Sequence, residues 1–243
     1  MCGRYVAASP PDEVAAYFGS EVALPELAPS YNVAPTSDVA AVVQPGGEPT
    51  APRLEAFHWG LVPRWAKEIK IGNRMINARG ETVATKNSFR SAFARRRCII
   101  PADGFYEWRK SAADPKRKQP YYIHRADGEP LAMAGLWERW RDPEAEGDVE
   151  ELHSCTIVTT GANAFMAPIH DRMPVLLPRT AFDEWLDPDQ RDTEALRRLL
   201  VPAPEGLLVA HAVDTAVGNV RNRGAELRDP IQPDDPEFAA LLT

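Results

Sequence analysis

The sequence lacks the features of several protein classes. Its 243 residues include only three cysteines, Cys2, Cys98 and Cys155, and no CxxC pair, which argues against a disulfide scaffold and indicates a reducing compartment. No apolar run approaches bilayer length, and the first residues turn polar at once, so we expect neither a membrane span nor a secretory signal. The five histidines show no HxxxH spacing, so we predict no metal site.

Glycine is scarce relative to proline, at 15 residues against 23, and so many prolines argue against a long helical bundle. Hydrophobic residues make up 44% and charged residues 26%, as in ordinary soluble globular proteins, which excludes disorder over most of the chain. We find no internal repeat and no linker. The sequence therefore predicts one domain over residues 1–243, large enough to bury a sizeable core.

Strand signals outnumber helix signals. Strands are predicted at 39–43, 53–59, 98–100, 105–108, 121–124, 131–137, 154–160, 175–177 and 207–213. Helices are predicted after Ser9 as cap up to Gly19, at 88–93, over 180–200 with Thr180 as cap and a break at Pro188, and from Asp235. This pattern predicts an α+β fold around a bent, mainly antiparallel sheet with a few peripheral helices.

The net charge of −7 hides a basic segment. Residues 53–119 carry 16 Lys and Arg against 6 Asp and Glu, so their local balance is +10 in an acidic protein. A concentrated basic segment can attract phosphates, although charge alone fits a solvated surface equally well.

Cys2 is the most informative residue. Its small side chain suits removal of Met1, which would leave an α-amine with a pKa of ~8 and a thiol with a pKa of ~8.5 on one residue. Such an aminothiol can condense with an aldehyde to a Schiff base and then close to a thiazolidine. It could also serve an N-terminal nucleophile hydrolase, with the amine as base. A buried, inert cysteine is the third alternative.

Four further segments combine aromatic, amide and charged residues: 59–65 (WGLVPRW), 77–82 (NARGET), 101–108 (PADGFYEW) and 170–174 (HDRMP). On the strand predicted in the third segment, Tyr106 and Trp108 share one face and Glu107 takes the other. Each segment alone has an ordinary explanation, since tryptophans are usually core residues and a histidine such as His170 is more often a structural hydrogen-bonding group.

Together with residues 1–5 (MCGRY), these segments resemble the SRAP family of SOS-response-associated peptidases, or abasic-site-processing proteins. The resemblance runs from Cys2 to about Leu177, and no core motif position departs from it. It implies a single domain whose sheet folds into a pseudo-barrel. It also implies a role in the DNA damage response, with binding of single-stranded DNA and covalent capture of abasic sites, and it implies no cofactor.

The resemblance implies four catalytic residues. Cys2 would be the covalent nucleophile, and Asn77 would bond near Cys2 and the opened sugar. Glu107 would position or deprotonate the α-amine and shuttle protons, while His170 would assist sugar ring opening and the reverse reaction. The enzyme would therefore use lyase-type Schiff-base chemistry, and the peptidase label would refer to removal of Met1.

Five residues are implied to bind DNA. Arg4, Arg79 and Arg172 would hold phosphates beside the lesion, as guanidinium groups do well. Trp65 and Trp108 would stack on bases or cover the end of a duplex. The expected partner is single-stranded DNA with abasic sites, including single/double-strand junctions, bound by a monomer in the cytoplasm.

Two rival classes stay open at this point. An amidotransferase-like hydrolase would explain Cys2 but neither the basic segment nor Glu107 between two aromatic residues. A plain nucleic-acid-binding module would leave Cys2 inert.

Overall fold

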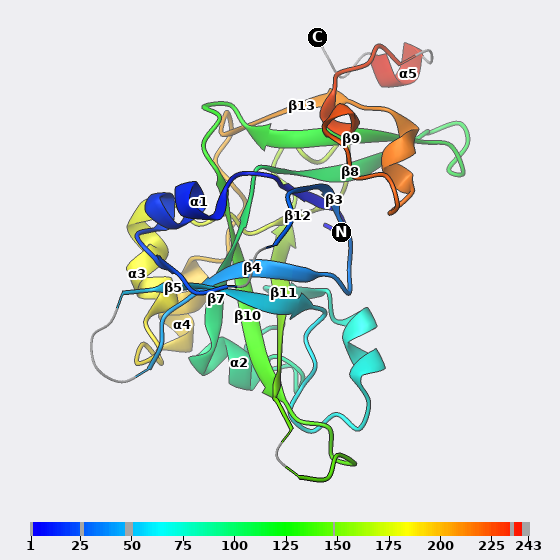
Figure 1. Cartoon of the computed structure of the whole chain (residues 1–243). Helices are drawn as coiled ribbons and strands as arrows, with labels where there is room; N and C mark the ends of the chain where they lie inside the picture. The colour runs from blue at the N-terminus through cyan, green and yellow to red at the C-terminus, as the bar shows by residue number, and fades with distance from the viewer. Residues whose placement is uncertain (1, 25–26, 47–50, 148, 234–235, 240–243) are drawn as a thin grey trace.

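The computed structural model describes the chain except residues 1, 25–26, 47–50, 148, 234–235 and 240–243. Its larger sheet contains a closed ring of five strands (Figure 1): β4 (Asp38–Val43), β5 (Arg53–Trp59), β7 (Arg97–Ala102), β10 (Leu131–Trp140) and β11 (Leu152–Gly161). The order is β11-β10-β7-β4-β5, and parallel pairing of β5 with β11 closes the ring. The predicted α+β fold with a barrel-like, mainly antiparallel sheet is confirmed.

Three short strands extend this sheet outside the ring. β2 (Glu21–Val22) pairs with β5, while β6 (Asn77–Arg79) and β12 (Arg172–Pro174) both pair with β11. The second sheet is antiparallel throughout, in the order β13-β9-β8-β1-β3, and lies above the ring in Figure 1. Its strands are β1 (Tyr5–Ala7), β3 (Ser30–Val33), β8 (Gly104–Lys110), β9 (Lys118–Arg125) and β13 (Leu208–Ala212).

Alternation along the ring strands divides the buried residues between two cores. Neighbouring residues on a strand point to opposite faces. Cys98 and Met133 therefore join the core shared with the second sheet, to which Phe105 and Tyr121 contribute. Ile99, which follows Cys98, and Ala132, which precedes Met133, join the core beneath the helices.

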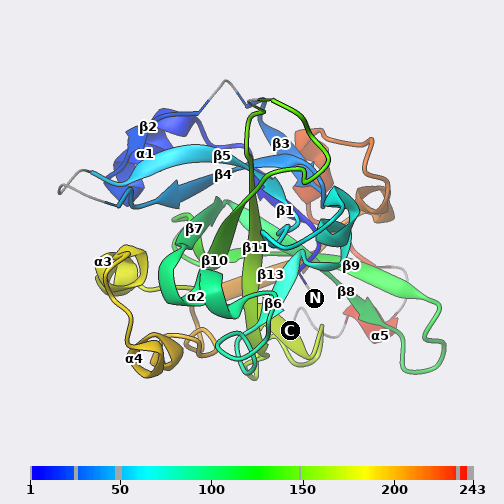
Figure 2. The same ribbon diagram turned by 90° about the horizontal axis from the view of Figure 1, so that it is seen from below.

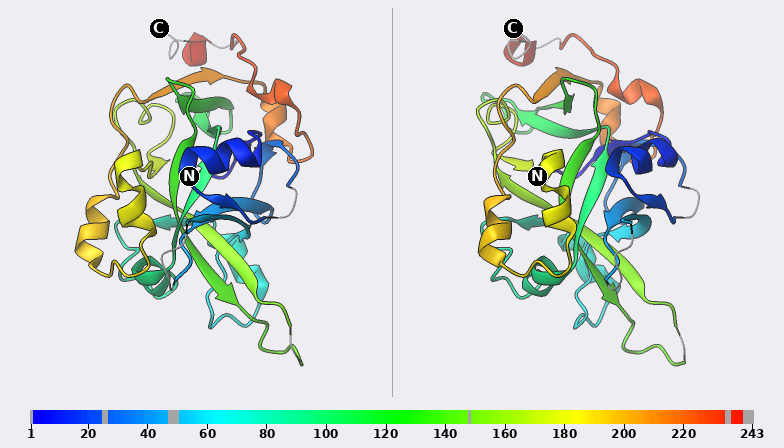
Figure 3. Two further views of the ribbon diagram at one scale, coloured as in Figure 1. Left: turned by 60° about the vertical axis from the view of Figure 1, so that its left-hand side comes forward. Right: turned by 90° about the vertical axis from the view of Figure 1, so that its left-hand side faces the viewer.

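Four of the helices contribute side chains to the core beneath them. They are α1 (Pro11–Phe18), α2 (Arg90–Arg95), α3 (Phe182–Leu186) and α4 (Thr193–Arg198), with α5 (Pro236–Ala239) at the end of the chain. Four 3-10 turns add to them: η1 (Ile69–Arg74), η2 (Arg179–Ala181), η3 (Thr215–Gly218) and η4 (Ala225–Arg228). Seen from below, α2 and α3 lie beside β7 (Figure 2), and the side views place α3 next to α4 (Figure 3).

The helix breaks were predicted better than the helix caps. α1 ends at left-handed Gly19 and Pro188 separates α3 from α4, as predicted. The predicted cap at Ser9 is wrong, because its hydroxyl donates to Asp103 instead. The predicted cap at Thr180 is also wrong, because that residue lies inside η2 and no side chain caps α3.

Three other predictions of local structure differ from the structure or fall outside the described residues. The strand predicted at 175–177 is wrong: β12 ends at Pro174, and Leu176 makes only a single bridge to Met133. The helix predicted at 88–93 begins later, at Arg90, without a side-chain cap. The predicted start of the last helix, Asp235, lies outside the described residues. The short strands β1, β2, β3 and β6 were not predicted.

Asp103 fastens the N-terminal segment to the turn between β7 and β8. Its carboxylate accepts from the backbone N–H groups of Ala8, at 2.6 Å, and Ser9, at 3.1 Å, and from the Ser9 hydroxyl. The Asp103 N–H in turn donates to the Val6 carbonyl at 2.9 Å. This turn therefore holds β1 in register on β8, where Tyr5 pairs with Phe105.

We predict that Asp103→Ala lowers the free energy of unfolding by about 2–3 kcal/mol, because it removes a charged acceptor of three hydrogen bonds. Chemical denaturation measures this loss. Asp229→Ala is the matched control, since Asp229 is exposed and should change stability by less than about 0.5 kcal/mol. Equal stability of the two variants would contradict the anchoring role.

Candidate active site

Cys2 is buried in the core shared by the two sheets. Its side chain is 0% exposed and packs with Tyr5, Cys98 and Cys155. The Asn77 side-chain amide donates to the Cys2 carbonyl at 2.9 Å. β1 follows directly and pairs with β8, so sheet pairing brings the start of the chain against the strand that carries Glu107.

Glu107 is a buried carboxylate on a central strand. β8 lies between β1 and β9, and Glu107 is only 3% exposed. The predicted alternation is confirmed, because Tyr106 and Trp108 pack together in a separate cluster on the other face. Burial raises the pKa of Glu107 above its ordinary value, while the nearby charge of His170 acts in the opposite direction. Glu107 therefore lies within electrostatic range of the His170 ring.

The thiol of Cys2 is held in its protonated form. Burial raises its pKa far above the ordinary value, and the negative charge of Glu107 raises it further. A hydrogen bond from the Arg4 backbone acts in the opposite direction. Cys2 therefore needs a base, or a cation that develops beside it, before it can act as a nucleophile.

His170 precedes β12 and is partly open to solvent, with a side chain 26% exposed. Its Nδ1 lies 3.0 Å from the Arg172 backbone nitrogen and 2.9 Å from Oδ1 of Asp171. The ring is thus held through Nδ1 and lies within the electrostatic range of Glu107. This arrangement suits a group that passes protons.

Asn77 is set by strand pairing. β6 lies parallel to β11, with Asn77 opposite Ile157 and Arg79 opposite Thr159. Nδ2 of Asn77 donates to the Cys2 carbonyl. The buried Oδ1 of Asn77 has no hydrogen-bond partner among the described residues. A buried amide oxygen that accepts nothing is costly. It marks a place where a hydroxyl or amine donor would be bound favourably.

The three arginines predicted to hold phosphates occupy different surroundings. The Arg4 guanidinium donates to Asn32 and to the carbonyls of Val217 and Gly218, which fixes the segment around η3. Arg172 binds both carboxylate oxygens of Glu81 and the Thr159 carbonyl, and its side chain is 14% exposed. Arg79 is exposed, and its side chain makes no hydrogen bond to the described part of the chain.

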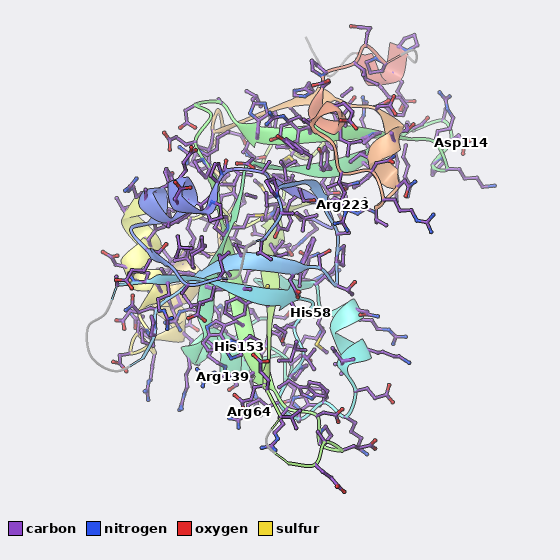
Figure 4. All side chains as sticks on the ribbon, in the orientation of Figure 1. His58, Arg64, Asp114, Arg139, His153 and Arg223 are labelled. Atoms are coloured by element: carbon purple, nitrogen blue, oxygen red, sulfur yellow. The ribbon has the colours of Figure 1, made fainter. Side chains whose placement is uncertain are left out.

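The basic segment does not form one continuous surface. Arg97 is buried, where it donates to the carbonyls of Phe93 and Trp185, and Arg96 is paired with Glu138 at 2.7 Å. Figure 4 shows Arg64 near the lower end of the β10–β11 hairpin and Asp114, also within the segment, at the tip of the β8–β9 hairpin. Only part of the local charge of +10 is therefore available near Cys2.

The two tryptophans predicted to contact bases also differ. Trp65 follows β5 and is 57% exposed, which leaves its ring accessible. Trp108 is partly buried and packs with Val6, Tyr106 and Val213, on the opposite face of β8 from Glu107. A hydrogen bond joins Asn77 to Cys2, and electrostatic interactions relate Cys2 to Glu107 and Glu107 to His170. Both tryptophans and the Arg4 guanidinium have their described contacts elsewhere.

Sequence reasoning missed Glu81. It lies in the 77–82 segment, two residues after Arg79, but only the fold shows that it pairs with Arg172, 91 positions away. The described residues include no cluster of three His, Cys, Asp or Glu side chains fit to hold a metal ion. Within the same part of the chain, no helix is long and apolar enough to span a membrane.

Comparisons with known proteins agree on one family. The family model described as SOS response associated peptidase (SRAP) matches residues 1–220. The abasic site processing protein YoqW of Bacillus subtilis is 42% identical, with 93% of this chain and 98% of that protein covered. Abasic site processing protein YedK of Escherichia coli is 34% identical over 95% of this chain and all of YedK.

A more distant relative and a solved structure also match this chain. Abasic site processing protein HMCES of Xenopus tropicalis is 33% identical, over 82% of this chain and 65% of that protein. A crystal structure of a Bacteroides thetaiotaomicron protein superimposes with a TM-score of 0.82 at 26% identity, covering 95% of this chain and all of that one.

The raised pKa of Glu107 predicts a pH-dependent stability. An ordinary unfolded glutamate has a pKa of about 4.3, so the folded protein takes up the proton more readily than the unfolded chain. The contribution of the Glu107 proton to the free energy of unfolding is fully present below about pH 4 and is lost as the pH rises through the folded pKa. We predict that Glu107→Gln becomes increasingly more stable than the wild type from pH 4 to pH 8.

Thermal or chemical unfolding of both proteins across this pH range measures the difference. Glu68→Gln is the control, because Glu68 is exposed and its replacement should give a difference that does not change with pH. A Glu107→Gln advantage that shrinks toward pH 8 would contradict the burial argument.

Proposed function

Because the chain belongs to the SOS response associated peptidase (SRAP) family, we propose that it processes abasic sites in DNA, the activity named for its relatives. It binds single-stranded DNA and captures the abasic sugar covalently through Cys2. The observation that carries this proposal is the contact of Cys2 with Asn77, beside the buried Glu107. Removal of Met1, a residue outside those described, would expose the α-amine.

The first step is condensation. The Cys2 α-amine attacks the aldehyde of the opened sugar, and loss of water gives a protonated imine. His170 assists this step by delivering a proton to the ring oxygen as the closed sugar opens. The unfilled acceptor, Oδ1 of Asn77, takes a hydrogen bond from the amine or from a sugar hydroxyl. Cys2, His170 and Asn77 thus each have one task in this step.

The second step is ring closure. The new iminium cation lies beside the thiol and favours the thiolate, which offsets the burial that otherwise keeps Cys2 protonated. The thiolate then attacks the imine carbon. A C–S bond forms, the imine electrons return to nitrogen, and a thiazolidine results. Glu107, with its raised pKa, accepts the thiol proton and can return it when the cross-link reverses.

DNA affinity comes from the exposed cations and from Trp65. Arg79 is exposed and lies two residues after Asn77 on β6, which supports a role at a flanking phosphate. Trp65 offers an accessible ring on which a base can stack.

We propose that the protein acts as a monomer in the cytoplasm, associated with the nucleoid when bound, and that single/double-strand junctions are among its substrates.

An abasic single-stranded oligonucleotide tests the proposal directly. Incubation with the mature protein should give a heat-resistant, slower band on a denaturing gel, and an intact oligonucleotide of the same sequence should give none. Hydrolysis of glutamine without such a band would favour the amidotransferase-like hydrolase. Reversible retention alone would favour a plain binding module.

We predict that Cys2→Ala abolishes the shifted band and that Cys2→Ser leaves at most a weak product that requires borohydride. Serine keeps the α-amine but offers a poorer nucleophile for ring closure. Cys98→Ala is the matched control, because Cys98 is equally buried in the same core and should still cross-link once folded. Undiminished cross-linking by Cys2→Ala, or by protein that retains Met1, would refute the thiazolidine mechanism.

We predict that Arg79→Ala weakens binding to single-stranded DNA and reduces the slope of log affinity against log salt by about 0.7, the value for one lost phosphate contact. Titration of a labelled oligonucleotide at several salt concentrations measures both effects. Arg198→Ala, an equally exposed change on α4, should alter neither. Identical slopes for the two variants would place Arg79 outside the DNA interface.

A further inference from the structure

Nδ1 of His170 has two neighbours that it cannot bind in the same protonation state. The Arg172 backbone N–H, at 3.0 Å, can only donate and therefore needs the Nδ1 lone pair. The Asp171 carboxylate, at 2.9 Å, can only accept when ionised and therefore needs a proton on Nδ1. A neutral ring bound to Arg172 carries its single proton on Nε2.

The two neighbours differ in how firmly they are held. The Asp171 side chain is 88% exposed, so water can replace it at little cost. The Arg172 backbone belongs to β12, where Arg172 pairs with Gly161 of β11. Its N–H is therefore the fixed partner of Nδ1, and the Nε2–H form is the favoured neutral tautomer.

Glu81 holds Arg172 from the opposite end. Its two carboxylate oxygens bind the two terminal nitrogens of the Arg172 guanidinium, one of them at 2.9 Å. The same guanidinium donates to the Thr159 carbonyl at 2.8 Å, and the backbone N–H of Gly80 donates to that carbonyl at 2.8 Å as well. Arg172 at the start of β12 and Gly80 after β6 thus share the Thr159 carbonyl as acceptor. The ion pair between Glu81 and Arg172 adds a second link between these two segments.

We propose that Glu81 is a positioning residue for His170. It clamps Arg172 so that the Arg172 backbone N–H keeps His170 in the Nε2–H tautomer, the neutral form in which Nε2 carries the proton. This inference rests on the proposed function for its kinetic consequence, although the tautomer itself does not.

The charged groups around His170 are consistent with this role. Glu107 faces it from β8, Asp171 adjoins it, and Arg172 follows on β12. Hydrogen bonding from Arg172 lowers the pKa of Glu81, so Glu81 is ionised at neutral pH and the clamp is intact there.

The test uses Glu81→Gln in the full mature chain, with nitrogen-15 labelling of histidine. The imidazole nitrogen signals of wild-type His170 should show the Nε2–H tautomer at alkaline pH. In Glu81→Gln they should move toward the tautomer mixture of free histidine. Glu194→Gln removes a glutamate from the exposed pair with Arg197 and should leave the His170 signals unchanged.

Kinetics give a second readout. With saturating abasic DNA, Glu81→Gln should slow cross-linking about ten-fold, a partial loss of the ~10²–10⁴ that acid–base help supplies, while the half-saturating DNA concentration stays within two-fold. In a His170→Ala background, the same change should have no further effect. An equal effect in that background would overturn the proposal.

Other results would also overturn it. Unchanged His170 signals in Glu81→Gln would remove the link between Glu81 and the tautomer. Tighter DNA binding with unchanged signals would show instead that Glu81 competes with phosphate for Arg172. If Glu81→Gln does not fold, Arg172→Lys, which keeps the charge but not the two-point clamp, should show the same tautomer mixture. If the wild type forms no cross-link, the proposed function fails, and the nitrogen signals still decide the positioning role.

Discussion

The arrangement of the site depends on the hydrogen bonding of one strand, β11. It pairs with β10 and β5 within the ring, and with β6 and β12 outside it. Asn77 and Arg172 are therefore fixed to the same strand, opposite Ile157 and Gly161. A slip of one residue would turn every side chain to the other face. The apolar side chains of β11, buried on both faces, make such a slip costly, so core packing sets the geometry of the polar site.

Burial of the polar groups then sets their chemistry. Cys2 and Glu107 lie where two sheets meet, and both lose their contact with water. Desolvation keeps the thiol protonated and raises the pKa of the carboxyl group. The same surroundings that make Cys2 inert at rest strengthen the field of any cation formed beside it. A thiol held in this way is protected from ordinary thiol chemistry until a cation forms beside it.

The sequence allowed the fold class and the central strands to be predicted because alternation is a local signal. The placement of Glu107 opposite Tyr106 and Trp108 followed from the same period of two. The caps at Ser9 and Thr180 failed because a hydroxyl near a helix start can bind elsewhere, and Ser9 is taken by Asp103, 94 positions away. Short strands such as β6, with three residues, have too few positions to show a period.

The arginines predicted to bind phosphates show why residue type and spacing predict a site less well than they predict a strand. Arg4 and Arg172 stand in motifs that suit DNA contact, yet the fold gives each of them partners within the chain. A guanidinium has five donors, so binding within the protein does not exhaust it, but it does fix its direction. In the proposed complex a phosphate can meet Arg172 only from the side that Glu81 and Thr159 leave open. The proposed clamp on His170 would then also restrict how DNA approaches Arg172.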